Sequence, residues 1–214
     1  MEPEELARLQ AEDRAGFCER LDVSRETLQK LDRYVAMLTE WQTRMNLVAP
    51  STLGHVWERH IADSLQLDAL LPPFETGCDL GSGGGLPGIV VAIMRPDAKV
   101  HLVESVGKKA SFLRAVADDL GLNTHVHARR IEASGQALKR SEVVTARALA
   151  ALDKLCGLVS PHIEPQTRCF FAKGASHESE IAAARERWSF NLKIHGSSLA
   201  EGSVILELSE IRAL

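Results

Sequence analysis

Apolar residues in the first part of the chain recur at helical spacing. One stripe follows Ser24, a residue suited to cap a helix start, and its members stand three or four positions apart: Leu28, Leu31, Val35, Leu38 and Trp41. A second stripe consists of Val56, Trp57, Ile61 and Leu65. Pro50 separates the stripes, and Pro72–Pro73 ends the second one. Residues 1–73 are therefore expected to form an N-terminal helical extension, with both tryptophans in its core.

From residue 74 onward, short apolar strands alternate with helical segments. Strands are expected near Gly77–Leu80, Lys99–Glu104, Thr124–Ala128, Glu142–Thr145 and Arg168–Ala172. Helices are expected near Gly88–Met94, Lys108–Leu120, Ala150–Val159 and Glu178–Trp188. Two final strand-like stretches, Asn191–His195 and Ser203–Leu208, are joined only by a loop, which indicates an antiparallel hairpin. The pattern predicts an α/β, Rossmann-like domain over 74–214 with a mostly parallel sheet, packed with the extension as one compact unit.

The glycine-rich run Asp79–Gly88 stands between the first strand and the first helix of this domain. Glycine lets a backbone turn tightly and approach a ligand closely, and strand-to-helix turns of α/β proteins bind nucleotides. The GxGxxG spelling that ends at Gly88 is weak evidence for a dinucleotide. Asp79 ahead of Gly81, with Pro87 at the helix start, favours S-adenosylmethionine over NAD.

Further cofactor candidates follow the next two strands. Glu104 ends the second strand, 19 residues after Gly85, where a carboxylate can accept hydrogen bonds from ribose hydroxyls. Because NAD and S-adenosylmethionine both contain a ribose, Glu104 does not decide between them. Ile131 and Glu132 follow the third strand, where residues of this fold flank an adenine or form an ordinary loop. A dehydrogenase and a non-catalytic binding module therefore stay open as alternatives.

Composition and charge narrow the class of protein. The 214 residues are 45% hydrophobic and 25% charged, with a net charge of −4, so no general affinity for nucleic acid is expected. Residues 1–70 carry 8 basic against 13 acidic side chains and residues 95–147 carry 10 against 6, which is either a phosphate-binding half or a random split. The longest apolar run, Ile89–Met94, is too short to span a bilayer. With an acidic N-terminus and four cysteines that lack metal or CxxC spacing, we expect a cytoplasmic protein with reduced thiols and no metal site.

The chain lacks two motifs of base-modifying enzymes. After the fourth strand stands Thr145–Leu149 in place of the Asn/Asp-Pro-Pro-Tyr/Phe element that holds an exocyclic amine, and there is no Pro-Cys nucleophile. The methyl acceptor should then need neither deprotonation nor covalent activation. Guanine N7, which has a free lone pair and no proton, fits this requirement. Transfer would be an in-line displacement driven by positioning, without a general base.

Several segments together match a known family. They are Asp79–Gly88, Leu102–Ser105 with Lys108–Lys109 and Phe112–Arg114, Ala146–Ala148 and Lys173–Gly174, with Trp41, Asn46–Leu47 and Arg59–Leu65 upstream. The chain resembles the bacterial 16S rRNA guanine-N7 methyltransferases, also called glucose-inhibited division protein B, over roughly residues 30–210. The resemblance implies a class I S-adenosylmethionine-dependent methyltransferase fold. It also implies methylation of one guanine in the decoding-region loop of 16S rRNA, with S-adenosylhomocysteine as the product.

The resemblance also carries over site residues. Family cofactor contacts correspond to Gly81, Leu86, Ile131, Glu132 and Arg147, and Asp79, Gly83, Gly85 and Glu104 complete the expected cofactor site. Gly84 departs from the family pattern, in which a larger residue or proline is common at this place. We expect no functional cost from that departure.

Charged residues near the site are candidates for catalysis and RNA binding. Arg147 could orient the methionine carboxylate or the target guanine, and Lys173 could bind an RNA phosphate at the same rim, so both are placed in the catalytic set. Further RNA-phosphate candidates, each equally consistent with a solvated face, are Lys108, Lys109, Arg114, Arg129 and Arg130. His60 and Asp63 share a helix face and are expected to anchor the extension to the sheet rather than bind metal. The expected partner is 16S rRNA, within the small ribosomal subunit or its assembly intermediate, with no obligate protein partner.

Overall fold

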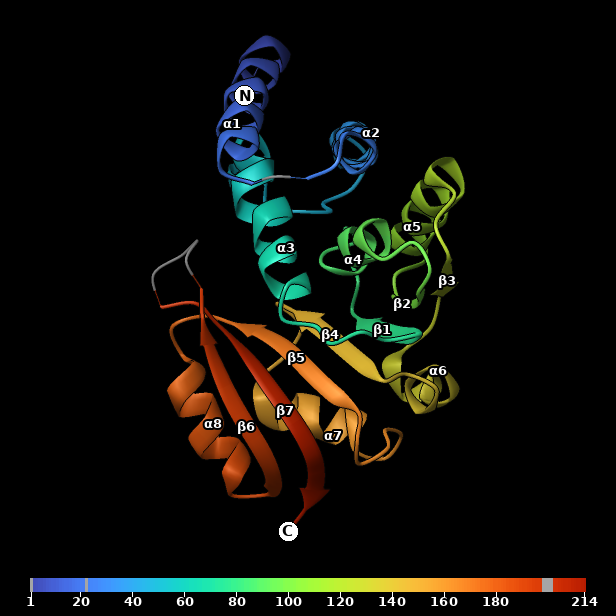
Figure 1. Cartoon of the computed structure of the whole chain (residues 1–214), viewed down its shortest axis with the longest axis vertical. Coiled ribbons are helices and arrows are strands. Elements are labelled where there is room, and N and C mark those ends of the chain that lie inside the picture. Colours follow the sequence, from blue (N-terminus) through green and yellow to red (C-terminus); the bar gives the residue numbers. More distant parts are fainter. Residues whose placement is uncertain (1, 22, 198–201) are drawn as a thin grey trace.

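A single twisted sheet forms the middle of three layers (Figure 1). The computed structural model describes residues 2–21, 23–197 and 202–214, and within them the sheet has seven strands: β1 (Thr76–Leu80), β2 (Lys99–Val103), β3 (Thr124–His127), β4 (Val143–Arg147), β5 (Arg168–Lys173), β6 (Trp188–Gly196) and β7 (Val204–Ala213). Their order is β3-β2-β1-β4-β5-β7-β6, and β7 alone runs in the direction opposite to the other strands. The mostly parallel sheet with a terminal antiparallel hairpin is therefore confirmed.

Helices cover both faces of this sheet. The domain contains α4 (Gly88–Met94), α5 (Gly107–Leu120), η3 (Ile131–Ala133), α6 (Gly135–Lys139), α7 (Leu152–Val159) and α8 (His177–Arg185). Side chains alternate along each strand, so Val143 and Phe170 pack with α4 and α5, whereas their neighbours Val144 and Phe171 pack with α6, α7 and α8. Strands that are apolar on both sides are what a sheet buried between two helical layers requires.

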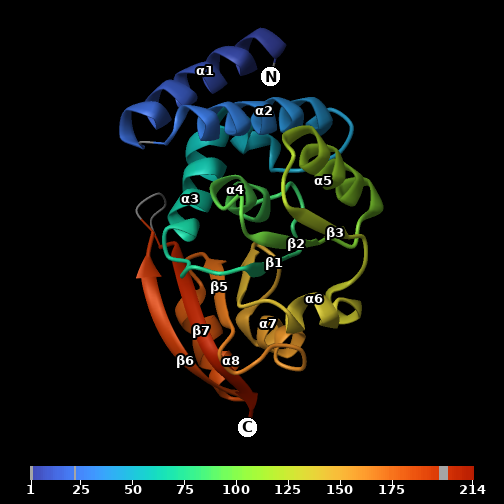
Figure 2. The same ribbon diagram turned by 45° about the vertical axis from the view of Figure 1, so that its right-hand side comes forward.

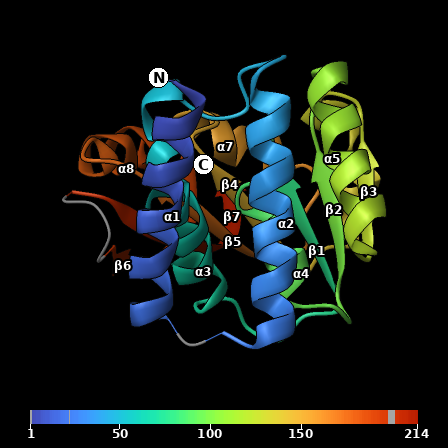
Figure 3. The same ribbon diagram turned by 90° about the horizontal axis from the view of Figure 1, so that it is seen from above.

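The N-terminal extension packs against one of these faces. It consists of α1 (Pro3–Arg20), α2 (Arg25–Gln42), the 3-10 helix η1 (Pro50–His55), the π-helical turns η2 (Trp57–Ala62) and α3 (Asp63–Asp68). Ser24 caps α2, because its Oγ accepts from the backbone N–H of Thr27 at 3.1 Å. Figure 3 shows α2 beside α4 and α5, and the buried face of α2 shares one hydrophobic cluster with both. Figure 2 shows α1 and α2 at the opposite end of the molecule from the C-terminus, whereas α3 lies beside the hairpin, where Gln66 donates to the Gly196 carbonyl at 3.0 Å.

Several element boundaries differ from the sequence-based expectation. The expected second helix of the extension is instead η1, η2 and α3 in succession, and α1 and α6 are not marked by any apolar stripe. Only Phe17 of α1 is buried, where its ring lies 5.0 Å from that of Trp57. Helix α8 ends at Arg185, before the predicted Trp188, because Trp188 pairs with Ala213 across the hairpin.

No helix in the described ranges has the length and apolarity needed to cross a membrane. The four cysteines are free thiols: Cys18 is exposed, and Cys78, Cys156 and Cys169 are buried.

Candidate functional site

The glycine loop, residues 81–87, follows β1 beside β4, where the strand order reverses. Such a reversal opens a crevice at the carboxyl ends of the strands. Gly81, Gly83 and Gly85 have φ angles of +64°, +53° and +92°. A Cβ on Gly81 would lie 2.5 Å from the Leu149 side chain, and one on Gly85 would lie 2.6 Å from Ile89. The loop therefore depends on glycine, and the surface that it presents is backbone.

Glu104 ties this loop to the turn before α5. Its carboxylate accepts from the Gly83 N–H at 2.9 Å and from the Val106 N–H at 2.7 Å, and the residue is only 6% exposed. A carboxylate has about four acceptor positions. Glu104 can therefore hold the loop with two of them and still accept hydrogen bonds from a ligand.

Asp79 lies beneath the loop and is 1% exposed. Its Oδ1 accepts from the Thr145 hydroxyl at 2.7 Å, whereas its Oδ2 has no hydrogen-bond partner among the described residues. Burial raises the pKa of Asp79 to about 6, and the hydrogen bond from Thr145 opposes that rise. The carboxylate supports the loop from below, so any effect on a ligand passes through the backbone above it.

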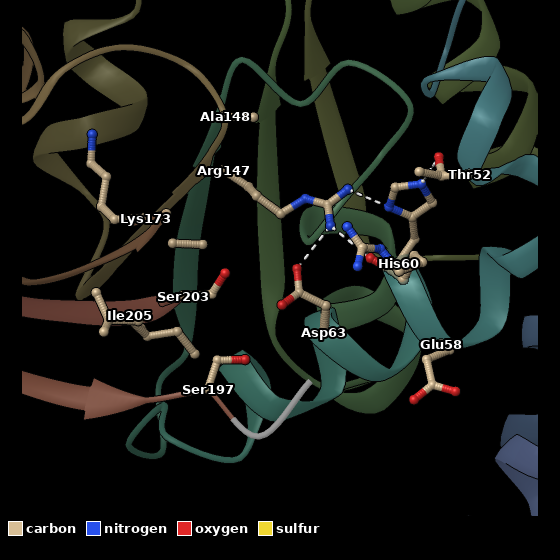
Figure 4. Close-up of a pocket in the computed structure, with 14 residues that line it drawn as sticks. Thr52, Glu58, His60, Asp63, Arg147, Ala148, Lys173, Ser197, Ser203 and Ile205 are labelled. Atoms are coloured by element: carbon tan, nitrogen blue, oxygen red, sulfur yellow. Dashed lines mark hydrogen bonds and ion pairs between the residues drawn. The ribbon is translucent and has the colours of Figure 1, made fainter. Parts of the chain in front are cut away.

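Arg147, the last residue of β4, joins the sheet to the extension. Its guanidinium donates to Asp63 at 2.8 Å, to His60 Nδ1 at 2.8 Å and to the Arg59 carbonyl at 3.4 Å, as Figure 4 shows for the two side chains. The expected anchor between extension and sheet is thus confirmed for His60 and Asp63, and its partner in the sheet is Arg147. The guanidinium side chain is 19% exposed and held in place from one side.

His60 is neutral and fixed in one tautomer. An arginine can only donate, so His60 Nδ1 accepts and the ring proton sits on Nε2, which donates to the Thr52 hydroxyl at 2.8 Å. The Thr52 hydroxyl in turn donates to the Ala49 carbonyl at 2.8 Å. Burial, followed by the charge of Arg147, lowers the pKa of His60 to about 3. Both ring nitrogens are engaged, which leaves His60 no position from which to accept another proton.

A cavity of about 320 Å³ opens beside Arg147, between the extension and the ends of β4, β5 and β7 (Figure 4). Its size is in the range of small-molecule sites. The carboxylates that line it are paired: Glu58 with Arg20 at 2.7 Å, and Asp63 with Arg147. In the described part of the chain, no unpaired histidine or carboxylate lines this cavity.

Lys173, at the end of β5, lines the same cavity but turns its ammonium away from Arg147 (Figure 4). The ammonium donates to Glu180 at 2.7 Å and to the Ala150 carbonyl at 2.5 Å, and its side chain is 7% exposed. In this arrangement Lys173 presents its stem to the cavity, and its charge is neutralised by α8.

Comparison with known proteins places this geometry in a family. The family model described as rRNA small subunit methyltransferase G matches residues 27–203. The chain belongs to that family. It is 48% identical to ribosomal RNA small subunit methyltransferase G of Cereibacter sphaeroides (strain ATCC 17025) over 202 residues, covering 92% of this chain and 96% of that protein. It is 46% identical to the Bradyrhizobium sp. (strain ORS 278) protein of the same name, over 87% of this chain and 86% of that one.

Solved structures with similar folds are distant from this chain in sequence. One is a mutant of MtNAS in complex with S-adenosylmethionine, with a TM-score of 0.58 and 15% identity over 96% of this chain and 77% of that one. Another is a putative O-methyltransferase from Klebsiella pneumoniae, with a TM-score of 0.57 and 12% identity over 96% and 99%. The likeness confirms the class I methyltransferase fold, and the family makes this chain a methyltransferase.

The basic residues predicted to bind RNA lie on one helix and one turn. Lys108, Lys109 and Arg114 are on α5, and Arg129 and Arg130 follow β3. All but the half-buried Lys109 are exposed. Of the other predicted cofactor residues, Leu86 and Ile131 are buried, whereas Glu132 is exposed.

One contact at the site has no signal in the sequence. The Tyr34 hydroxyl of α2 donates to the Gly84 carbonyl at 2.5 Å, and both groups are buried. A Cβ on Gly84 would lie 3.0 Å from the Leu47 carbonyl. Gly84 is therefore the loop residue that contacts the extension, through Tyr34 and Leu47. This contact is where the chain departs from the family pattern. In the sequence, Tyr34 looks like an ordinary core residue of a helix, so only the packed structure shows that its hydroxyl bonds to Gly84.

Proposed function

We propose that this protein transfers a methyl group from S-adenosylmethionine to N7 of a guanine in the decoding-region loop of 16S rRNA. The observation that carries the proposal is that the glycine loop, held by Glu104, and Arg147, which lines the cavity, stand at the carboxyl ends of the neighbouring strands β1 and β4. Family membership supports methylation of small-subunit rRNA. The cytoplasm, as the place where ribosomes assemble, is part of the same proposal.

The residues at the loop fit S-adenosylmethionine. Glu104 keeps free acceptor positions for ribose hydroxyls, the glycines of 81–85 allow close approach to the backbone, and Ile131 provides an apolar side chain for the adenine. Arg147, at the end of β4 beside the loop, would meet the methionine carboxylate, for which a guanidinium is well suited. The bound cofactor supplies a methyl group made electrophilic by its positive sulfur.

The charges around the cavity favour an acceptor that has no proton to lose. Glu58, Asp63 and His60 are all engaged, so none of them is poised to act as a general base. Guanine N7 needs no base, because its lone pair lies in the ring plane and carries no proton. The protein's contribution is then to hold the two reactants in line and exclude water, and positioning alone can lower a barrier substantially. A fixed Arg147 serves that purpose better than a mobile one.

Methyl transfer to small ribosomal subunits that lack the modification tests the proposal. Tritiated S-adenosylmethionine is supplied, the rRNA is digested, and the label is expected in 7-methylguanosine. Parallel reactions with deproteinised 16S rRNA show whether the folded particle is the substrate. Label on an exocyclic amine or a ribose hydroxyl would overturn the proposed target. The matched pair Arg147→Lys and Arg212→Lys keeps the positive charge at both positions, so it separates loss of the guanidinium at the site from a general effect of replacing arginine by lysine, because Arg212 is 71% exposed on the terminal hairpin.

A further inference from the structure

A second concave surface lies on the opposite side of the sheet from α4 and α5. It is a groove of about 570 Å³ between the edge strands β2 and β3 and the short helix α6. Figures 1 and 2 show β3 at the free edge of the sheet with α6 beside it. The groove is lined by Lys99, His101, Thr124, His125, His127, Arg129, Ala133, Ser134, Gln136, Ala137 and Arg140.

Three histidines form the floor of this groove. His101 on β2 is in register with His125 on β3, and His127 is two residues further on, so all three side chains share one face of the sheet. Their ring centroids are 4.6 to 6.0 Å apart, and His127 Nε2 lies 3.1 Å from His101 Nδ1. No group of three or more histidine, cysteine or acidic side chains in the described ranges is arranged to hold a metal ion. The cluster therefore presents three polar aromatic rings.

Positive charge surrounds the histidines. Lys99 faces them from β2, Arg129 from the turn after β3, and Arg140 from the end of α6. No aspartate or glutamate lines the groove within the described residues. Burial, followed by His125 and then by Lys99 and Arg140, lowers the pKa of His101, and burial with the neighbouring histidines lowers the pKa of His127 to about 4. An anion in the groove would favour the protonated rings and reverse these shifts.

The cations span the length of the strands. Arg129 lies at the carboxyl end of β3, next to Arg130 and Ile131 at the rim of the site, whereas Lys99 is the first residue of β2 and so lies at the amino ends of the strands. Arg140 precedes β4 and so also lies at the amino ends of the strands. A single phosphate would meet one end of this arrangement, but an extended polyanion would meet both. Imidazole rings and arginine planes are surfaces on which unpaired bases stack, and here His125 is exposed while His101 and His127 are half-buried.

We infer that this groove binds a single-stranded segment of RNA, its phosphates on Lys99, Arg129 and Arg140 and its bases against the histidine rings. The inference rests on the proposed function in taking RNA as the partner. It adds a second contact region that begins at the rim of the site and runs along the edge of the sheet, away from the reacting atoms. Such a region would hold the substrate RNA in register without touching the target base.

Binding of a fluorescent uridine oligonucleotide of about 20 residues tests the groove, because it contains no guanine and exceeds a typical single-strand site. The full-length double variant Lys99→Ala/Arg140→Ala is compared with Lys193→Ala/Arg212→Ala, which removes the same charge from exposed positions on the hairpin. The groove variant should bind roughly tenfold more weakly, and its log Kd against log salt slope should be shallower by about 1.4, since each single-strand phosphate contributes about 0.7. The control should match wild type in both. Equal binding by the two variants overturns the inference, as does tight binding of uridine monophosphate, which would indicate a small-anion pocket.

The histidines supply an independent readout. Wild-type affinity should rise as the pH falls from about 8 to about 6, because bound phosphate favours protonation of the rings. The triple variant of His101, His125 and His127 to Gln should lose that rise, while His177→Gln on α8 should keep it. A triple variant with unchanged pH dependence counts against the groove. Failure of methyl transfer leaves these binding results intact, and loss of the groove's binding leaves the guanine target intact, so the two proposals fail separately.

Discussion

Replacing Asp79 tests whether the carboxyl group beneath the glycine loop has a raised pKa in the folded protein. The side chain is 1% exposed and has one satisfied oxygen, so folding places a charge where water cannot reach it. Burial raises the pKa of Asp79 from 3.8 to about 6. The variant Asp79→Asn keeps an acceptor for the Thr145 hydroxyl and removes the ionisation.

The sign of the effect follows from proton counting. Between pH 3.8 and about 6 the unfolded chain has released the Asp79 proton while the folded chain retains it. The unfolding free energy therefore falls as the pH rises through this window, by about 3 kcal/mol in total, and Asp79 causes no further change above it. Because other groups titrate in the same range, the useful quantity is the difference between Asp79→Asn and wild type. That difference should move in favour of the variant by roughly 2–3 kcal/mol between about pH 4 and pH 7.5, or roughly 5–10 °C in Tm.

Urea unfolding followed by tryptophan fluorescence at several pH values measures this difference. Asp97→Asn, at an exposed position before β2, is the matched control and should run parallel to wild type. If the curves of Asp79→Asn and wild type also run parallel across the range, Asp79 ionises normally in the folded protein. The account of the loop as resting on a costly buried charge would then be wrong.

Three further substitutions address the loop and the arginine beside it. Tyr34→Phe leaves the buried Gly84 carbonyl without its donor and should lower the unfolding free energy by roughly 1–3 kcal/mol, measured by urea unfolding. Glu104→Ala removes both backbone anchors of the carboxylate and should weaken S-adenosylmethionine binding at least about tenfold in calorimetry; unchanged affinity would remove Glu104 from the site. Asp63→Asn frees one side of the Arg147 guanidinium and should lower kcat roughly 10- to 100-fold in single-turnover assays while S-adenosylmethionine affinity changes less; an unchanged rate would show that the ion pair serves stability alone.

The sheet could be predicted because its strands are short apolar runs between clear turn signals. Where prediction failed, the local pattern carried little information. Helix α1 buries a single apolar residue, Phe17, so no stripe marks it. The stretch from Trp57 to Ala62 has helical periodicity but forms wider π-helical turns. Trp188 suits a helix or a strand equally well, and its pairing with Ala213 at the far end of the hairpin decides the matter.

Some residues of the candidate site could be predicted from the sequence, and others could not. The glycines and Glu104 can be recognised in the sequence, because a tight turn requires glycine and the carboxylate stands at the end of the next strand at a fixed spacing from it. The partners of Arg147 and Lys173 lie far from them along the chain or in another element, and spacing cannot reveal them. Asp63 is 84 residues from Arg147, and Glu180 reaches back to Lys173 from α8. From the sequence, Lys173 is expected to bind an RNA phosphate, but in the structure its ammonium pairs with the Glu180 carboxylate.

The extension therefore belongs to the site as much as to the core. It reaches the loop through the hydrogen bond from Tyr34 to Gly84, and it reaches the end of β4 through His60 and Asp63 on Arg147. Both contacts are made by residues from 1–73, one to the loop after β1 and the other to the end of the neighbouring strand β4. A change in the extension that shifts α2 or η2 must move the loop or the guanidinium. The hydrophobic cluster that α2 shares with α4 and α5 opposes such a shift, because a packed interior has little room to rearrange. The helices of the extension thus fix the glycine loop and the Arg147 guanidinium in position.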